Sequence, residues 1–197
     1  MNSSSFIKSL PNLVFEDNAS FPFSEKTHPL VIQDPQSYRR RYETQLSVFD
    51  IFNFRKLKIA DIGGGIGVHA EYMRLKGHDV CMYEPNVEYC NLASKHFPNL
   101  HVVNNFFDHK IYDMITFFSP ETEFENSINT DPSFLKRNCV AILVDQRALK
   151  FNKMLPEICD RIVYRHDHFT HDCIRRTVLL RTFQIGSDML RNYIYET

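Results

Sequence analysis

The stretch Asp61-Ile62-Gly63-Gly64-Gly65-Ile66-Gly67 decides the fold prediction. The chain has only six glycines, and four of them fall within these seven residues. Residues 57–62 (LKIADI) form a short apolar run that ends at the glycines, as a buried strand does. Glycine lacks a Cβ atom, so the backbone can turn sharply here and approach a ligand closely. Val68, Tyr72 and Leu75 then recur at helical spacing, which predicts a strand, a glycine turn and a helix.

Apolar runs and helical stripes continue to alternate after this unit. Asn86 is expected to cap the helix between the second and third strands. The last two β-prone runs are joined by too few residues for a parallel crossover, which favours an antiparallel hairpin. The sequence therefore predicts an α/β fold with a mostly parallel sheet, helices on both faces and a C-terminal antiparallel hairpin. The expected strands are residues 57–62, 78–84, 101–103, 111–118, 139–145, 161–169 and 174–183.

Two segments precede the first strand. Residues 1–35 contain four of the nine prolines and several serines and asparagines, which predicts an irregular arm or lid pinned by its phenylalanines. Asp34 and Pro35 then suit the start of a helix over residues 36–53, and this helix opens the main domain, residues 36–197.

Composition limits the class of protein. The 197 residues suffice for one domain, and 23 basic against 24 acidic side chains give a net charge of −1, which disfavours a strongly basic nucleic-acid or membrane binder. The five cysteines are odd in number and include no CxxC pair, so we expect reduced thiols in a cytoplasmic protein. No apolar run approaches the ~20 residues of a membrane span, and no secretory signal is expected. The oligomeric state is not predicted.

Two carboxylates flank the expected ligand site. Ligands of open parallel sheets bind beyond the carboxyl ends of the strands. Asp61 lies just before the glycine turn, and Glu84 ends the second strand 23 residues later. A carboxylate at the position of Glu84 can accept two hydrogen bonds from ribose hydroxyls.

These motifs resemble the class I S-adenosylmethionine-dependent methyltransferases. Asp61-x-Gly63-x-Gly65-x-Gly67 fits the first motif of that family, and Glu84 fits its acidic residue after the second strand. Residues 102–108 (VVNNFFD) and 111–119 (IYDMITFFS) are similar to its third motif and fourth strand. The resemblance covers about residues 57–184 and implies a seven-stranded sheet in the order 3-2-1-4-5-7-6.

The resemblance also implies roles in binding S-adenosylmethionine. Asp61 and the loop of Gly63, Gly64, Gly65 and Gly67 would hold its amino acid part. Glu84 would hold the ribose, and Asn105 and Phe106 would contact the adenine. Two carboxylates suit a ligand with a sulfonium and an ammonium better than one with a pyrophosphate.

Two other functions remain open. Residues 65–70 match the GxGxxA pattern of nicotinamide-binding proteins, but Asp61 would then lie near the pyrophosphate and the chain lacks a second βαβ half. The second alternative is an inactive methyltransferase-like binding or scaffold protein.

The methyl acceptor is not identified by the sequence. Positioning supplies much of the rate of methyl transfer, so catalytic residues leave little sequence signal. The signatures of several methyltransferase subclasses are missing, which leaves an oxygen or nitrogen acceptor on a small molecule or on RNA, the cap guanine included. Tyr42, Ser119 and His166 are the candidate catalytic residues.

Two charged groups have plain and functional interpretations. Arg39 to Arg41 are expected on a solvated face, although with Arg175 and Arg176 they would suit RNA phosphates. The histidine-rich residues 166–173 meet no standard zinc spacing, so no metal site is expected. They are expected to form a polar hairpin tip with solvated histidines, and a base near the methyl acceptor is the alternative. His69 is expected on a helix surface.

Overall fold

The computed structural model describes residues 1–20, 35–105, 111–118, 139–147, 161–169 and 175–182. Seven strands form one sheet in the order β3-β2-β1-β4-β5-β7-β6, which confirms the predicted order. The strands from β3 to β5 run parallel, and β7 pairs antiparallel to both β5 and β6, so the predicted hairpin is also confirmed. The strands are β1 (Lys58–Ile62), β2 (Asp79–Tyr83), β3 (His101–Val103), β4 (Met114–Phe118), β5 (Ala141–Arg147), β6 (Arg161–Phe169) and β7 (Arg175–Thr182).

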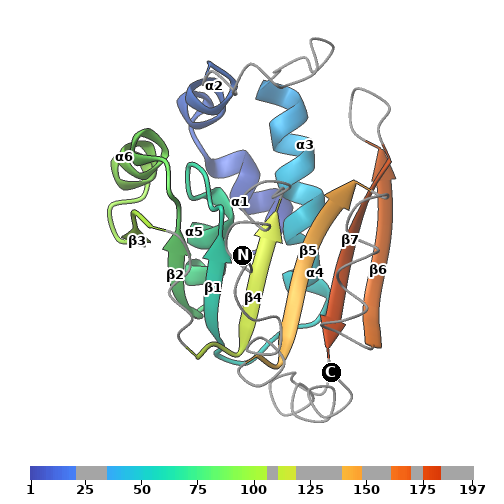
Figure 1. Ribbon diagram of the computed structural model, residues 1–197. Coiled ribbons are helices and arrows are strands. Elements are labelled where there is room, and N and C mark those ends of the chain that lie inside the picture. The colour runs from blue at the N-terminus through green and yellow to red at the C-terminus, as the bar shows by residue number, and fades with distance from the viewer. Residues whose placement is uncertain (21–34, 106–110, 119–138, 148–160, 170–174, 183–197) are drawn as a thin grey trace.

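The described helices lie over one face of the sheet and beyond its upper edge (Figure 1). Apolar side chains that alternate along the strands fill this layer, because successive strand residues point to opposite faces. A second buried cluster, which includes Ile62 and Phe117, lies on the other face. The helices are α1 (Ser3–Ser9), α2 (Asn12–Ser20), α3 (Pro35–Leu46), α4 (Val48–Ile51), α5 (Val68–Leu75) and α6 (Val87–His96).

The N-terminal residues differ from the predicted irregular arm, because residues 3–9 and 12–20 are helical. The Asn2 side chain caps α1 by accepting a hydrogen bond from the Ser5 backbone N–H (2.8 Å), and Pro11 directly precedes α2. The expected anchoring by aromatic residues is confirmed, since Phe6 and Phe15 are fully buried. Polar residues and prolines near the start of a helix resemble those of a loop, which is why a loop was predicted here. Phe21 and Phe23 lie outside the described residues.

The helix expected over residues 36–53 is divided into α3 and α4 at Ser47. Pro35 occupies the first position of α3, as predicted, whereas Asp34 lies outside the described residues. The fourth strand begins at Met114, later than expected, and the fifth extends to Arg147. Asn86 caps α6, as predicted, by accepting from the Glu88 backbone N–H at 2.8 Å.

Candidate functional site

The glycine loop joins β1 to α5 at the edge of the sheet toward which the parallel strands point (Figure 1). Gly63, Gly65 and Gly67 have φ values of 67°, 56° and 84°, which side chains with a Cβ atom rarely adopt. The Gly63 and Gly64 backbone N–H groups donate to the Tyr83 carbonyl oxygen at 2.9 and 3.3 Å. The end of β2 thus holds the turn in place.

The two central glycines differ in their surroundings. A Cβ atom on Gly64 would lie 2.3 Å from Cγ of the buried Met82, so any side chain there would have to displace Met82. A Cβ atom on Gly65 would meet no atom within 4 Å. The loop is therefore packed against the protein at Gly64 and open at Gly65.

Asp61 is buried beneath this loop, with 1% of its surface exposed. Its Oδ1 accepts a hydrogen bond from the Thr116 hydroxyl at 2.6 Å. Its Oδ2 is buried and has no hydrogen-bond partner among the described residues, and it lies 3.1 Å from the Cβ position of Gly64. Burial raises the pKa of Asp61 to about 7, the Thr116 hydrogen bond opposes the rise, and the negative charge of Glu84 adds to it. An unpaired buried carboxylate of this kind favours a cationic partner.

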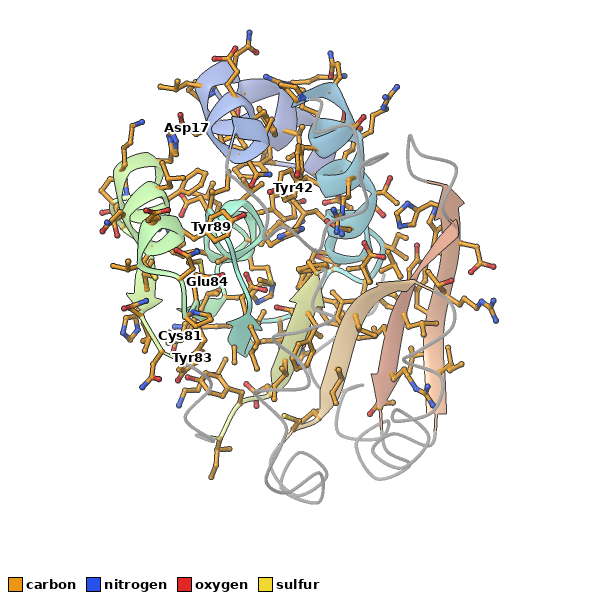
Figure 2. The ribbon with its side chains drawn as sticks, turned by 45° about the horizontal axis from the view of Figure 1, so that its top comes forward. Asp17, Tyr42, Cys81, Tyr83, Glu84 and Tyr89 are labelled. Atoms are coloured by element: carbon orange, nitrogen blue, oxygen red, sulfur yellow. The ribbon has the colours of Figure 1, made fainter. Side chains whose placement is uncertain are left out.

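Glu84 points toward the glycine loop. Its Oε2 accepts from the Gly65 backbone N–H and its Oε1 from the Asn86 backbone N–H, each at 2.9 Å. The side chain is buried, and the carboxylate has acceptor capacity beyond these two bonds. In the view of Figure 2, Tyr89 of α6 lies above Glu84.

The expected adenine contacts are only partly described. Asn105 is exposed just after β3, and its backbone N–H donates to the Val103 carbonyl oxygen at 2.9 Å. Phe106 lies outside the described residues. The neighbouring Asn104, which the sequence analysis missed, donates from its side chain to the carbonyl oxygens of Glu84 and Pro85, both at 3.0 Å. Asn104 thereby fixes the end of β2 that presents Glu84.

The three catalytic candidates lie in different surroundings. Tyr42 is buried, accepts a hydrogen bond from the Asn18 side chain at 2.9 Å and packs edge-on against His69. Burial raises the pKa of Tyr42, which keeps its phenol neutral. His166 is exposed on β6, and Ser119 lies outside the described residues.

A buried polar chain crosses from α5 to β6 at the same edge. His69 Nε2 lies 2.6 Å from Gln45 Oε1, and the Gln45 side-chain amide donates to Asp145 Oδ2. The other oxygen, Asp145 Oδ1, lies 3.5 Å from His168 Nε2. We call these four residues, His69, Gln45, Asp145 and His168, the polar chain. Gln45 and Asp145 are fully buried and His69 is 5% exposed, so the expectation of His69 on a helix surface is wrong.

Most of the polar chain was not predicted, because its members are far apart in the sequence. The one available signal was an acidic residue at the end of the most apolar strand, Asp145. The arginines expected on a solvated face are also partly used internally. Arg39 donates to the Ile7 carbonyl oxygen at 3.2 Å and covers the Phe15 ring, and Arg41 Nε lies 3.9 Å from Asp145 Oδ2.

Within the described ranges, no group of three or more metal-ligating side chains comes together. In the same ranges, no helix combines the length and apolar character needed to span a membrane. The described cysteines, Cys81, Cys90 and Cys139, are buried and free of disulfides.

Comparisons with known proteins give a clear result at the level of the fold. No protein-family model and no curated protein matches the chain. Among solved structures, a provisionally assigned RNA methyltransferase from Pyrococcus horikoshii is 11% identical, with a TM-score of 0.63 over 93% of this chain and 96% of its own. Magnesium protoporphyrin IX methyltransferase from Synechocystis, with bound S-adenosylmethionine, is 12% identical, with a TM-score of 0.59 over 92% and 98%.

A third structure, the N-methyltransferase NodS from Bradyrhizobium japonicum, is 11% identical, with a TM-score of 0.60 over 77% of this chain and 99% of its own. At such low identities these likenesses show the fold, which is that of class I S-adenosylmethionine-dependent methyltransferases.

Proposed function

We propose that the chain binds S-adenosylmethionine at the glycine loop and transfers its methyl group to an oxygen or nitrogen acceptor. The observation that carries this proposal is the pair of buried carboxylates, Asp61 and Glu84, on either side of the open position at Gly65. Asp61 Oδ2 is buried without a partner among the described residues, and a cationic amino group would satisfy it.

Each part of the site suits one part of this cofactor. Asp61 and the loop glycines would hold the amino acid part, Glu84 the ribose hydroxyls, and Asn105 and Phe106 the adenine. When bound, the cofactor supplies a methyl group on a positively charged sulfur. The protein residues bind and orient it, and burial keeps water from Asp61.

The fold is compatible with acceptors of very different size. The similar structures include an N-methyltransferase, a magnesium protoporphyrin enzyme and a provisionally assigned RNA methyltransferase. Both a small-molecule and an RNA acceptor therefore stay within the proposal. The internal use of Arg39 removes one of the cations expected to face RNA phosphates.

Isothermal titration calorimetry tests the cofactor site. We expect S-adenosylmethionine and S-adenosylhomocysteine to bind with micromolar affinity, and the substitutions Asp61→Ala and Glu84→Ala to abolish binding. The matched control is Asp79→Asn, which removes an exposed carboxylate at the opposite end of β2. Binding of NAD in place of S-adenosylmethionine would overturn the proposal. Binding of the cofactor without transfer to any acceptor would favour a scaffold protein.

A further inference from the structure

We propose that His168, held by Asp145, accepts the proton of the methyl acceptor, which is therefore a group that must lose a proton, such as a hydroxyl. This inference rests on the proposed function. It selects His168, from the histidine-rich residues 166–173, in place of the candidate His166.

The position of Asp145 relative to the cofactor site supports this role. The side chains of Asp61 and Thr116 contact each other, so both point to the same face of the sheet. Phe118 lies two residues beyond Thr116 on β4 and therefore points to that face as well. Asp145 on β5 is the register partner of Phe118. Asp145 thus projects beyond the same face, two strands from Asp61 and nearer the ligand-binding edge.

The polar chain connects this carboxylate to the glycine loop. His69 lies two residues after Gly67, in the first turn of α5, and its ring stacks on Phe118 with the centroids 4.0 Å apart and the planes 12° apart. Gln45 bridges His69 and Asp145 from α3. The groups that line this edge are therefore contiguous from the cofactor site to β6.

The contact between Asp145 and His168 joins a buried carboxylate to a buried ring nitrogen. A fully buried carboxylate costs free energy unless it is paired. The described cation beside it, Arg41, approaches only to 3.9 Å and is 22% exposed. His168 Nε2 is buried, lies 3.5 Å from Asp145 Oδ1 and has no hydrogen-bond partner among the described residues. Catalytic hydrogen bonds are often long before substrate binds and shorten in the complex.

The arrangement fixes which nitrogen is basic. When His168 Nε2 carries a proton toward Asp145, Nδ1 is left with a lone pair. In the transfer step, the O–H bond of the acceptor breaks and its proton goes to His168 Nδ1. The acceptor oxygen bonds to the methyl carbon, and the electron pair of the carbon–sulfur bond stays on sulfur. The resulting imidazolium pairs with Asp145, which is a positioning residue here.

Within the described part of the chain, three titratable or charged side chains lie near His168. Asp145 faces it from β5, Arg41 lies beside Asp145 on α3, and His166 stacks near it on β6, with ring centroids 6.2 Å apart. The exposed His166 has no carboxylate within ion-pair distance among the described residues, which distinguishes it from His168.

One test needs no acceptor. Nitrogen-15 NMR of the histidine rings at pH 8 should show His168 as the Nε2–H tautomer in the wild-type chain. Asp145→Leu should abolish this preference, and His166→Gln should leave it unchanged. An Nδ1–H tautomer at His168, or no response to Asp145→Leu, would overturn the proposal.

The second test measures transfer. Radiolabelled S-adenosylmethionine is supplied with the small-molecule and RNA fractions of a cell extract as acceptor pools. We expect His168→Ala to reduce methyl incorporation at least about 100-fold. Added imidazole should restore part of that rate, more so at higher pH. His101→Ala, an exposed histidine on β3, is the matched control for imidazole.

Calorimetry distinguishes failure of the proposed cofactor site from failure of the proposed role of His168. His168→Ala should bind S-adenosylhomocysteine as the wild-type chain does, whereas absence of binding by the wild-type chain would refute the proposed function itself. Three results would overturn the role of His168. They are full transfer by His168→Ala, failure of imidazole to restore the rate of that variant, and cofactor binding by the wild-type chain without transfer to either pool.

Discussion

Asp61 shows most clearly how burial prepares a side chain for a ligand. Thr116 satisfies one carboxylate oxygen, and the other is buried without a partner among the described residues. Burial, and to a lesser degree the nearby charge of Glu84, disfavours the ionised carboxylate, so the ligand-free site loses stability as the pH rises from about 4 to 7. A cationic ligand would relieve this destabilisation, so the same residue lowers stability and favours binding.

Asp61→Asn is expected to stabilise the ligand-free protein. The folded-state pKa of about 7 exceeds the unfolded value near 3.8, so ionisation of Asp61 costs stability as the pH rises between these values. The substitution removes that cost, and we expect a gain of about 1–3 kcal/mol at pH 8 that shrinks toward pH 4. Urea unfolding at both pH values measures it. Asp79→Asn is the control, and an equal change in stability at both pH values would contradict the cause.

The affinity for S-adenosylmethionine should decrease below pH 7. A cationic amino group binds the ionised form of Asp61, so the protein must release a proton when its pKa of about 7 lies above the pH. We expect about tenfold weaker binding per pH unit between pH 7 and 5.5. Calorimetry in two buffers with different heats of ionisation counts the released protons. Binding without proton release at pH 6 would show that Asp61 stays protonated.

A site residue could be predicted from the sequence only where a recognisable motif or strand lies next to it in the chain. Asp61 and Glu84 end strands whose apolar runs are visible, and the glycine loop marks their common edge. Gln45 and Asp145 are 100 residues apart, and they meet because α3 packs over β5. Periodicity places each residue on its own element and does not show which elements become neighbours.

At the scale of elements, the glycine loop combines a packed position and an open one. Gly65→Ala should keep the fold at a cost of about 1–2 kcal/mol from its positive φ, and its Cβ atom should reduce cofactor affinity at least about tenfold by filling the open space. Calorimetry and urea unfolding measure the two effects.

Two other glycines serve as comparisons. Gly77 also has a positive φ and open space around its Cβ position, but it lies at the far end of α5, so Gly77→Ala should cost stability alone. Gly64→Ala should cost about 1–3 kcal/mol of stability, because its Cβ atom overlaps Met82. If all three substitutions changed cofactor affinity equally, the space beside Gly65 would not be where the cofactor binds.

The accuracy of the element predictions depended on the kind of signal. Strands β1, β2 and β3 follow from apolar runs bounded by glycine or helix caps, and their order follows from the family resemblance. The N-terminal helices were missed because prolines and serines near a helix start resemble those of a loop. The overlooked signal in α1 was Leu10, which follows the buried Phe6 and Ile7 by four and three residues and packs against the core with them.

At the scale of the whole molecule, the N-terminal helices are part of the core. Phe15 is fully buried between the Arg39 guanidinium, 4.0 Å from its ring centroid, and the Tyr42 ring. In addition, Asp17 of α2 pairs with Lys95 and His96 of α6, at 2.9 and 2.8 Å. Residues 1–20 therefore connect α3 to α6 across the edge that carries the site. Their action as a lid stays a prediction.

Phe15→Ala should destabilise the protein by about 3–5 kcal/mol, because it leaves a cavity between α2 and α3. Urea unfolding of the full chain measures the loss. Leu13→Ala on the same helix is the control, since Leu13 is 48% exposed and should cost less than about 0.5 kcal/mol. Similar stability of the two variants would show that α2 is not docked in solution.

The position of β7 between β5 and β6 has a consequence for biosynthesis. During translation, β5 can pair with β4 on one side, but its other edge stays open until β7 emerges, 35 residues after β5 ends, since 182 − 147 = 35. At ordinary elongation rates this takes about 2–7 s. The nascent chain therefore carries the glycine loop and both carboxylates before it can close its sheet, and an exposed apolar strand edge in that interval is a target for chaperones.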